Sequence, residues 1–151
     1  MIKDLILKMW AEYNHSAYPI VEVNMKGNIN SDKEFELFTD EWLKLYEKKR
    51  DFVLIFDTRD VGWVSPRYAF MMADFITLLK KRRLVPNLEY LKRACIIVDS
   101  WWVKSLLWLI FYLEEPVCPI DYYDNVWDIN VECLLEEANR NLVISQKVRI
   151  V

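Results

Sequence analysis

The chain has 151 residues, of which 54% are apolar, and a net charge of −3 at neutral pH. This length suits one domain, and with only two glycines, Gly27 and Gly62, the chain has no linker-like segment. The negative charge argues against nucleic-acid binding, which needs a clear cationic excess. We therefore expect a single domain over residues 1–151 that does not bind nucleic acid.

The cysteines and the apolar segments indicate the compartment. Cys95, Cys118 and Cys133 are odd in number and contain no CxxC pair, so a disulfide framework is not expected. Charged residues at positions 3, 4 and 8 interrupt the N-terminus, unlike the apolar core of a signal peptide. The longest apolar run, 106–113, is far shorter than the roughly 20 residues that cross a bilayer. We expect a soluble, cytoplasmic protein with reduced thiols.

The N-terminal third predicts a strand followed by a helix. Residues 5–9 fit either a short strand or a helical turn. Apolar and polar residues alternate over 20–26, the pattern of a strand with one solvent-facing side. Ser31 and Glu34 have the spacing of a capping box, and apolar residues then recur at helical intervals to about residue 49.

The middle of the chain predicts a second strand and helix. Residues 52–56 are all apolar, which is typical of a strand covered on both faces in a parallel sheet. A loop is expected over 57–64. Ser65 and Pro66 then suit the N-cap and first position of a helix that runs to about Arg83.

The rest of the chain repeats this alternation. It predicts a buried strand over 94–98, a helix over about 101–115 capped by Asp99 or Ser100, a strand over 120–123, a helix over 129–139 and an edge strand over 142–151. Strands that alternate with helices imply right-handed crossovers. We therefore predict an α/β domain with a mostly parallel sheet of about four to six strands flanked by helices.

Two segments resemble known families. The sequence Ser-Trp-Trp-Val-Lys-Ser-Leu-Leu-Trp-Leu at 100–109, directly after the strand Cys-Ile-Ile-Val at 95–98, resembles the strand-then-helix segment of Sec14-like (CRAL-TRIO) domains, especially the BCH branch. Residues 57–67 are similar in layout to the strand–loop–helix turn of STAS domains. Stand-alone domains of this combined type occur in large DNA viruses and protists. The resemblance implies a Sec14/STAS-like (SpoIIAA-like) fold that binds a partner or a lipid.

Two features of these families are not carried over. STAS anti-anti-sigma factors place a phosphorylated serine in the helix-opening turn, where this chain has Pro66 and Arg67. Lipid-exchanging Sec14 proteins have a lysine before the strand that follows the gate helix, where this chain has Pro-Val-Cys-Pro at 116–119. The resemblance therefore implies neither a phosphoserine switch nor recognition of phosphoinositide head groups.

Catalytic patterns are lacking, with one possible exception. The only histidine is His15, and the sequence has no P-loop, GxGxxG or HExxH motif, so we expect neither an enzyme nor a cofactor. Asp57 and Asp99 end two predicted buried strands, and with Asp60 they could hold Mg²⁺ at the carboxyl edge of the sheet. Alternatively, Asp99 caps a helix and Asp57 accepts hydrogen bonds from loop N–H groups.

A basic run, Lys80-Lys81-Arg82-Arg83, ends the second predicted helix. Cations there complement the helix dipole and are commonly solvated. In a βαβ fold, however, this run shares one pole with the basic residues at 48–50 and 92–93, opposite a pole with several aspartates. A peripheral contact of the basic pole with an anionic membrane is therefore possible in principle.

The helix over 101–113 carries the main functional signal, because only Lys104 and Ser105 in it are polar. A helix that is apolar all round must bury more than one face. Its cover could be the last helix of the chain, a hydrophobic ligand beneath a gate, or a second copy of the protein. The residues expected in that contact are Trp102, Leu106, Trp108, Leu109, Ile110, Phe111 and Leu113.

We therefore expect a non-enzymatic interaction module that self-associates, as a homodimer, through the helix at 102–113. The first alternative is a protein that binds a lipid or another hydrophobic small molecule under this helix. The second is a Mg²⁺-dependent enzyme with an acidic site at Asp57 and Asp99.

Overall fold

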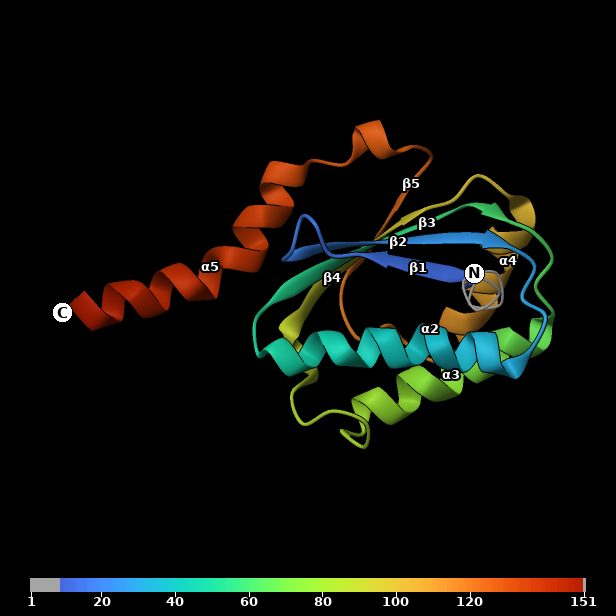
Figure 1. Cartoon of the computed structure of the whole chain (residues 1–151), viewed down its shortest axis with the longest axis horizontal. Coiled ribbons are helices and arrows are strands. Elements are labelled where there is room, and N and C mark those ends of the chain that lie inside the picture. Colours follow the sequence, from blue (N-terminus) through green and yellow to red (C-terminus); the bar gives the residue numbers. More distant parts are fainter. Residues whose placement is uncertain (1–8, 151) are drawn as a thin grey trace, which may run out of the picture.

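The computed structural model describes the backbone of residues 9–150 and the side chains of residues 9–141. Its centre is one five-stranded sheet whose spatial order follows the chain (Figure 1). The strands are β1 (Ala11–Asn14), β2 (Ile20–Gly27), β3 (Phe52–Val61), β4 (Leu91–Ile97) and β5 (Ile120–Tyr123). β1 is antiparallel to β2 and all other neighbours are parallel, so the predicted single α/β domain with a mostly parallel sheet is confirmed.

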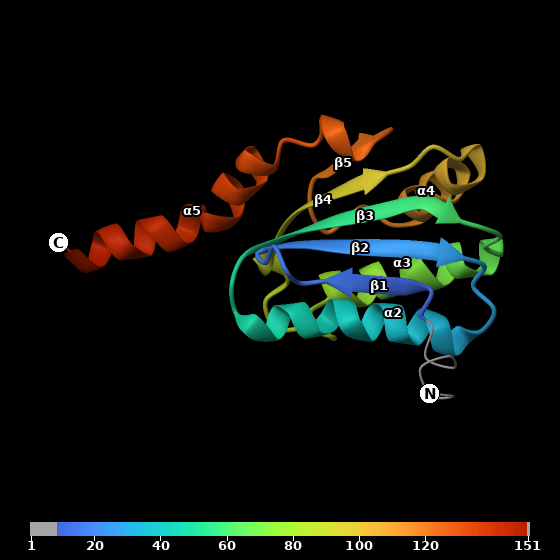
Figure 2. The same cartoon turned by 45° about the horizontal axis from the view of Figure 1, so that its top comes forward.

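Three helices cover one face of the sheet (Figure 2). They are α2 (Asp32–Leu45), α3 (Pro66–Lys80) and α4 (Trp101–Leu113), and each joins two neighbouring parallel strands. Because every new strand is added on the same side and crossovers are right-handed, all three helices must lie on the same face. The last helix, α5 (Val131–Ile150), follows β5 and packs on the opposite face.

The strands contribute to two separate cores because successive side chains point to opposite faces. On the helix side, Val23, Leu54 and Ile96 pack against α2, α3 and α4. On the other face, a smaller core is built from Ile20, Val53, Ile55, Cys95, Ile97, Ile129, Leu134 and Ala138. α5 therefore belongs to a different core from α4.

Predicted helix starts are confirmed by their caps. The Ser31 hydroxyl accepts a hydrogen bond from Glu34 N–H, and the Glu34 carboxylate accepts one from Ser31 N–H, which completes the capping box of α2. Ser65 caps α3, with Pro66 at its first position. Ser100, rather than Asp99, caps α4 by accepting from Val103 N–H.

Other boundaries differ from those predicted. β1 was not predicted, and β3 continues to Val61 through half of the expected loop. α3 ends at Lys80, three residues early. The prediction of an edge strand over 142–151 is wrong, since α5 continues to Ile150. An established helix propagates easily, whereas β propensity is a weak, context-dependent preference. The prediction for 5–9 lies outside the described residues, except for Met9.

No helix in the described part of the chain is both long and apolar enough to cross a membrane. All three cysteines are unpaired, and they differ in environment: Cys95 is buried, Cys118 is half-buried and Cys133 is exposed.

Candidate functional site

The helix α4 buries only one side against the domain. Val103 and Leu106 are buried in the helix-side core, and Ile110 packs against it one turn further on. These residues are spaced by three or four positions, so they form one face of the helix. Among the described residues, none covers the opposite face, and the described part of α5 packs on the other side of the sheet. Of the three covers considered from the sequence, the last helix is therefore the one that the described residues do not support.

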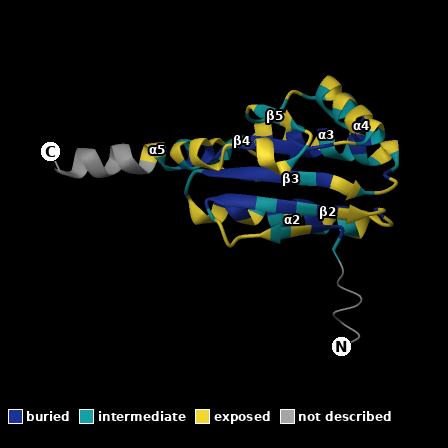
Figure 3. Ribbon diagram, turned by 90° about the horizontal axis from the view of Figure 1, so that it is seen from above, coloured by how far each residue is buried: buried dark blue, intermediate teal, exposed yellow. Residues whose placement is uncertain are grey.

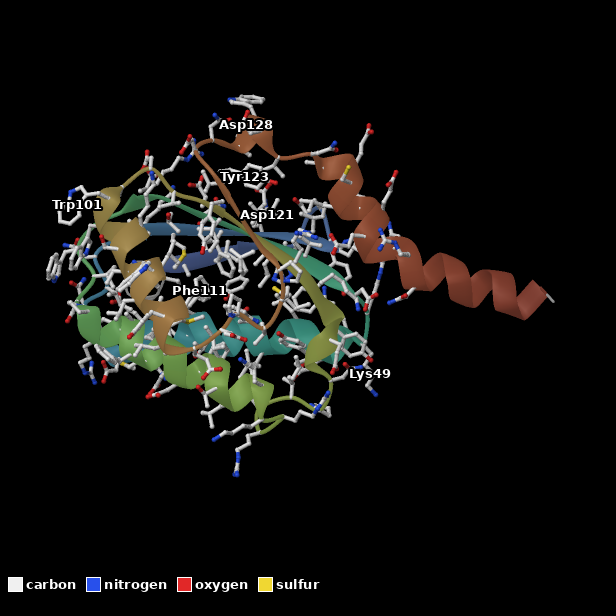
Figure 4. The ribbon with its side chains drawn as sticks, turned by 180° about the vertical axis from the view of Figure 1, so that it is seen from behind. Lys49, Trp101, Phe111, Asp121, Tyr123 and Asp128 are labelled. Carbon is white, nitrogen blue, oxygen red and sulfur yellow. The ribbon has the colours of Figure 1, made fainter. Side chains whose placement is uncertain are left out.

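Three large aromatic side chains occupy that outer face. Trp101, Trp108 and Tyr112 are 75%, 67% and 73% exposed, and we call them the aromatic stripe. Trp108 and Tyr112 lie one helical turn apart and stack with ring centroids 5.2 Å apart at an angle of 15°. Figure 3 shows exposed residues along the outer side of α4, and Figure 4 shows Trp101 at the N-terminal end of this helix.

A tryptophan cluster holds the N-terminal end of the stripe. Trp63, in the segment after β3, stacks on Trp102 with centroids 5.0 Å apart and rings almost parallel at 6°. Trp102 packs edge-on against Trp101 and donates a hydrogen bond from Nε1 to the Val64 carbonyl at 3.1 Å. Trp63 is itself 58% exposed and so extends the apolar surface beyond α4.

The predicted contact residues divide into three groups. Trp108 and Leu113 are exposed, as a docking surface requires. Trp102, Leu109, Ile110 and Phe111 are half-buried. Leu106 is only 7% exposed, so it cannot join a surface contact, but it lines the cavity beneath α4.

Sequence analysis missed Trp63, Trp101 and Tyr112 as contact residues. A helical projection could have found two of them, since positions 101, 108 and 112 fall on one side of α4 together with the polar Ser105. Trp63 carries no such signal, because its contact with Trp102 joins residues far apart in the chain.

An apolar cavity of about 140 Å³ lies beneath α4. The sheet forms its floor and α2, α3 and the segment after α4 its walls, with α4 above. Its lining includes Trp10, Met25, Phe35, Phe38, Trp42, Phe56, Thr58, Tyr68, Ala69, Met72, Ala94, Leu106, Ile110, Phe111 and Cys118.

Hydrogen bonds tie the residue after α4 to α3. The Glu114 carboxylate accepts hydrogen bonds from Lys80 Nζ at 2.6 Å and from Thr77 Oγ1 at 2.9 Å, both on α3. These two donors, Lys80 first, hold the pKa of Glu114 below its ordinary value. These bonds hold Glu114, which lies between Phe111 and Cys118, and both of those residues line the cavity.

The predicted acidic site does not form. The Asp57 carboxylate faces the Arg59 guanidinium, which bonds both of its oxygens and holds the pKa of Asp57 below its ordinary value. Asp60 and Asp99 are exposed, and together with Asp57 they act on the Arg59 guanidinium, which raises the pKa of Arg59. Among the described residues, no group of three or more metal-ligating side chains is placed to hold an ion.

The basic run at 80–83 is partly neutralised. Lys80 pairs with Glu114, and Arg82 pairs with Glu89 across the turn that leads to β4. Elsewhere at this pole Lys92 pairs with Asp51, so the expected strong charge polarity is reduced. All four residues from Lys80 to Arg83 are exposed.

The strand order, the three helices on one face and the C-terminal helix on the other define a single α/β domain of the SpoIIAA-like, or STAS-like, fold. The structure is similar to that of an uncharacterised protein from the DUF3478 family, with a SpoIIAA-like fold, from Shewanella loihica PV-4. The match covers 82% of this chain and 91% of that chain, with a TM-score of 0.53 and 13% sequence identity.

At this identity the likeness shows the fold alone. It supports the STAS-like part of the resemblance and gives no support to the Sec14-like part or to a viral source. No family model matches the sequence, and no curated protein matches it significantly.

Proposed function

We propose that the protein is a non-enzymatic interaction module that forms a homodimer through the aromatic stripe of α4. The observation that carries this proposal is the outward placement of three large aromatic side chains on an otherwise packed helix. At their measured exposure they present about 500 Å² of mostly apolar surface. A contiguous patch of this size on a monomer commonly marks a binding site.

The spacing of the stripe suits packing against another helix. Trp101, Ser105, Trp108 and Tyr112 follow one another at intervals of four, three and four residues. This alternation is the seam of a left-handed helix pair, in which two helices cross at about 20°. α4 therefore presents a short pairing seam to solvent.

The same seam is complementary to itself in the antiparallel direction. A twofold axis can be placed level with the midpoint between Leu106 and Leu107. This axis sets Ser105 opposite the partner's Trp108. It also sets Trp101 opposite the partner's Tyr112. Each large indole then faces a small hydroxymethyl side chain, and each outer indole faces a phenol ring. Such large-to-small matching lets two helices interdigitate, and a twofold interface requires self-complementarity of this kind.

Charge does not oppose the pairing. Lys104 is the only charged residue of α4, and the same axis sets it opposite the partner's Leu109 instead of the partner's Lys104. A lysine stem can cover apolar surface while its ammonium group stays in water. Two stripes together would bury about 1,000 Å², the lower limit for a specific interface, so we expect a dimer that dissociates on dilution.

Sedimentation velocity over a wide range of protein concentration tests the proposal. The wild-type protein should shift from monomer to dimer as concentration rises, and Trp108→Glu should remain monomeric, because a carboxylate would be buried without a partner. Trp127→Glu is the matched control, since Trp127 is 90% exposed but lies outside α4. A concentration-independent monomer, or equal effects of the two substitutions, would contradict the proposal.

Two other partners suggested by the sequence rank lower. A lipid carrier of the Sec14-like kind needs polar groups near its pocket for the head group, and the lining beneath α4 offers none that is free. Contact with an anionic membrane depends on Lys81 and Arg83, because Lys80 and Arg82 already pair with carboxylates. Two cations contribute only about 2 kcal/mol, at about 1 kcal/mol each.

A further inference from the structure

The cavity beneath α4 is distinct from the aromatic stripe and is not needed for self-association. Its lining comes from the inner face of α4, from α2, α3 and from the helix-side face of the sheet. The stripe residues Trp101, Trp108 and Tyr112 are not part of it. The two surfaces lie on opposite sides of the same helix, so each can be tested without the other.

Polar atoms of the lining side chains are already engaged elsewhere. Trp10 Nε1 donates to the Gly27 carbonyl at 3.1 Å, and Trp42 Nε1 donates to the Tyr46 hydroxyl at 3.2 Å. Thr58 donates from Oγ1 to the Ile97 carbonyl at 2.8 Å.

The remaining polar side chains of the lining offer little more. Tyr68 donates its hydroxyl hydrogen to Asp32 at 3.1 Å. Cys118 has only a weakly polar thiol. Within residues 9–141, no Asp, Glu, Lys, Arg or His side chain lines the cavity. A polar or charged ligand would therefore lose its hydration without gaining hydrogen bonds.

Water is an equally poor occupant. An ordered buried water needs about two to four polar partners, and the lining has no free group to supply them. An apolar cavity of about 150 Å³ lined by aliphatic and aromatic side chains stays dry and binds benzene or xenon. The cavity beneath α4 has a similar volume, about 140 Å³, and a similarly apolar lining, but it is partly open to solvent.

The lining also favours rings over chains. It includes the aromatic residues Phe35, Phe38, Trp42 and Phe56, which contact one another, and Met72 contributes a polarisable thioether. Aromatic guests gain from edge-to-face contacts with such rings and from contact with sulfur. The pocket is partly open, so its apolar lining is accessible to water, and covering that lining with an apolar guest is favourable.

We propose that this cavity is a binding site for a small, neutral aromatic molecule of about the size of benzene or toluene. The ligand is bound by apolar contact alone and displaces little or no ordered water. A diacyl lipid does not satisfy these requirements, because its two acyl chains are much larger than a space of about 140 Å³.

Calorimetric melting with toluene as the probe tests this site. Toluene should raise the melting temperature of the wild-type protein in a saturable way, because a ligand bound only by the native state stabilises it. Ala69→Leu places three further carbons into the cavity and should abolish the toluene-dependent rise. Ala138→Leu is the matched control: Ala138 is equally buried but lies in the core on the other face of the sheet, so this variant should keep the rise.

A variant of the aromatic stripe separates the two sites. Trp108→Glu, which should prevent dimer formation, should leave the toluene-dependent rise unchanged. No rise in the wild-type protein, or an equal rise in Ala69→Leu, would overturn the cavity proposal. Loss of the rise in Trp108→Glu would show that toluene binds the aromatic stripe instead, and would also overturn it.

Thiol protection provides a second measurement if Ala69→Leu fails to fold. Cys118 lines the cavity, Cys95 is buried on the other side of the sheet, and Cys133 is exposed. In a Cys133→Ser background, toluene at about ten times its Kd should slow the labelling of Cys118 by methyl methanethiosulfonate roughly tenfold. Labelling at an unchanged rate would overturn the proposal.

Discussion

Trp63 and Trp102 stack face to face with their ring centroids 5.0 Å apart. The pair joins the segment after β3 to the first turn of α4, and the bond from Trp102 Nε1 to the Val64 carbonyl fixes the same junction. Because Trp102 is held inward by these contacts, its neighbour Trp101 is directed outward. The position of the aromatic stripe therefore depends on the β3–α3 connection as well as on α4 itself.

Gly62 should be intolerant of a side chain for this reason. An added Cβ would lie 2.2 Å from Asn28 Oδ1, the atom that accepts a hydrogen bond from Trp63 N–H at 2.6 Å. Gly62→Ala must displace the Asn28 amide, and we expect it to lose about 1 kcal/mol, the net contribution of one hydrogen bond. Urea unfolding measures the loss.

Asn28→Ala removes the same bond from the other side. The double variant Asn28→Ala with Gly62→Ala should then cost little more than the more harmful single substitution, because coupled residues are not additive. Fully additive losses would show that the clash at Gly62 acts through some other contact.

Arg93 should matter more than the other arginines for stability. Its guanidinium, on β4, bonds Glu137 of α5 at 2.8 Å and Asp121 of β5 at 2.9 Å, and its side chain is 28% exposed. Arg93→Ala leaves two half-buried carboxylates without their cation, and we expect a loss of about 2 kcal/mol in urea unfolding, between the values for surface and buried pairs.

Arg93→Lys should restore only part of the loss, since an ammonium group cannot reproduce the forked geometry. Arg67 is the comparison, because its pair with Asp32 is exposed. If Arg67→Ala destabilised the protein as much as Arg93→Ala, partial burial would not be what makes the Arg93 cluster important.

Much of the fold could be predicted because its local signals are strong. Alternating residues in β2, uniformly apolar residues in β3 and β4, and serine caps before α2, α3 and α4 all agree with the structure. β1 could not be predicted, because its four residues are held mainly by pairing with β2 and by contacts with α2. These are long-range interactions that no local pattern reports.

The candidate site was predicted less well than the fold. The apolar character of α4 indicated that more than one face needs cover, but not which residues face inward. Leu106 and Trp108 have similar apolarity, and only the position of the helix on the sheet separates the buried leucine from the exposed indole. A ligand space under this helix was among the alternatives drawn from the sequence, but its lining and volume could not be predicted, because they depend on how well side chains from many elements fill a shared space.

Asp32 should make stability depend on pH in the acid range. The Arg67 guanidinium bonds its carboxylate, and with a smaller contribution from the Tyr68 hydroxyl this lowers the pKa of Asp32 to about 2, well below its ordinary value. A depressed carboxyl pKa stabilises the folded state above the unfolded pKa, near 4, and this contribution is lost as pH falls towards 2.

Asp32→Asn should therefore be less stable than the wild type at pH 7, and the difference should close between about pH 4 and pH 2. Urea unfolding at several pH values measures the difference. In an Arg67→Gln background most of it should disappear, because the main partner is gone. If the difference in unfolding free energy between the wild type and Asp32→Asn were as large at pH 2 as at pH 7, ionisation of Asp32 would not be its cause.

Tyr13 connects β1 to α2, and its hydroxyl should contribute to stability in two ways. It donates a hydrogen bond to the Phe38 carbonyl at 2.7 Å, and burial raises its pKa well above the ordinary value of about 10. Tyr13→Phe should lose about 1 kcal/mol at neutral pH, the net contribution of one buried bond.

The raised pKa gives this residue an alkaline signature as well. The unfolded chain ionises Tyr13 first, so its contribution is present below pH 10 and is lost as pH rises above that value. Tyr13→Phe should therefore lose less stability than the wild type between pH 10 and pH 11 in urea unfolding. Equal alkaline losses in the wild type and in Tyr13→Phe would show that β1 is not held to α2 by a protonated phenol.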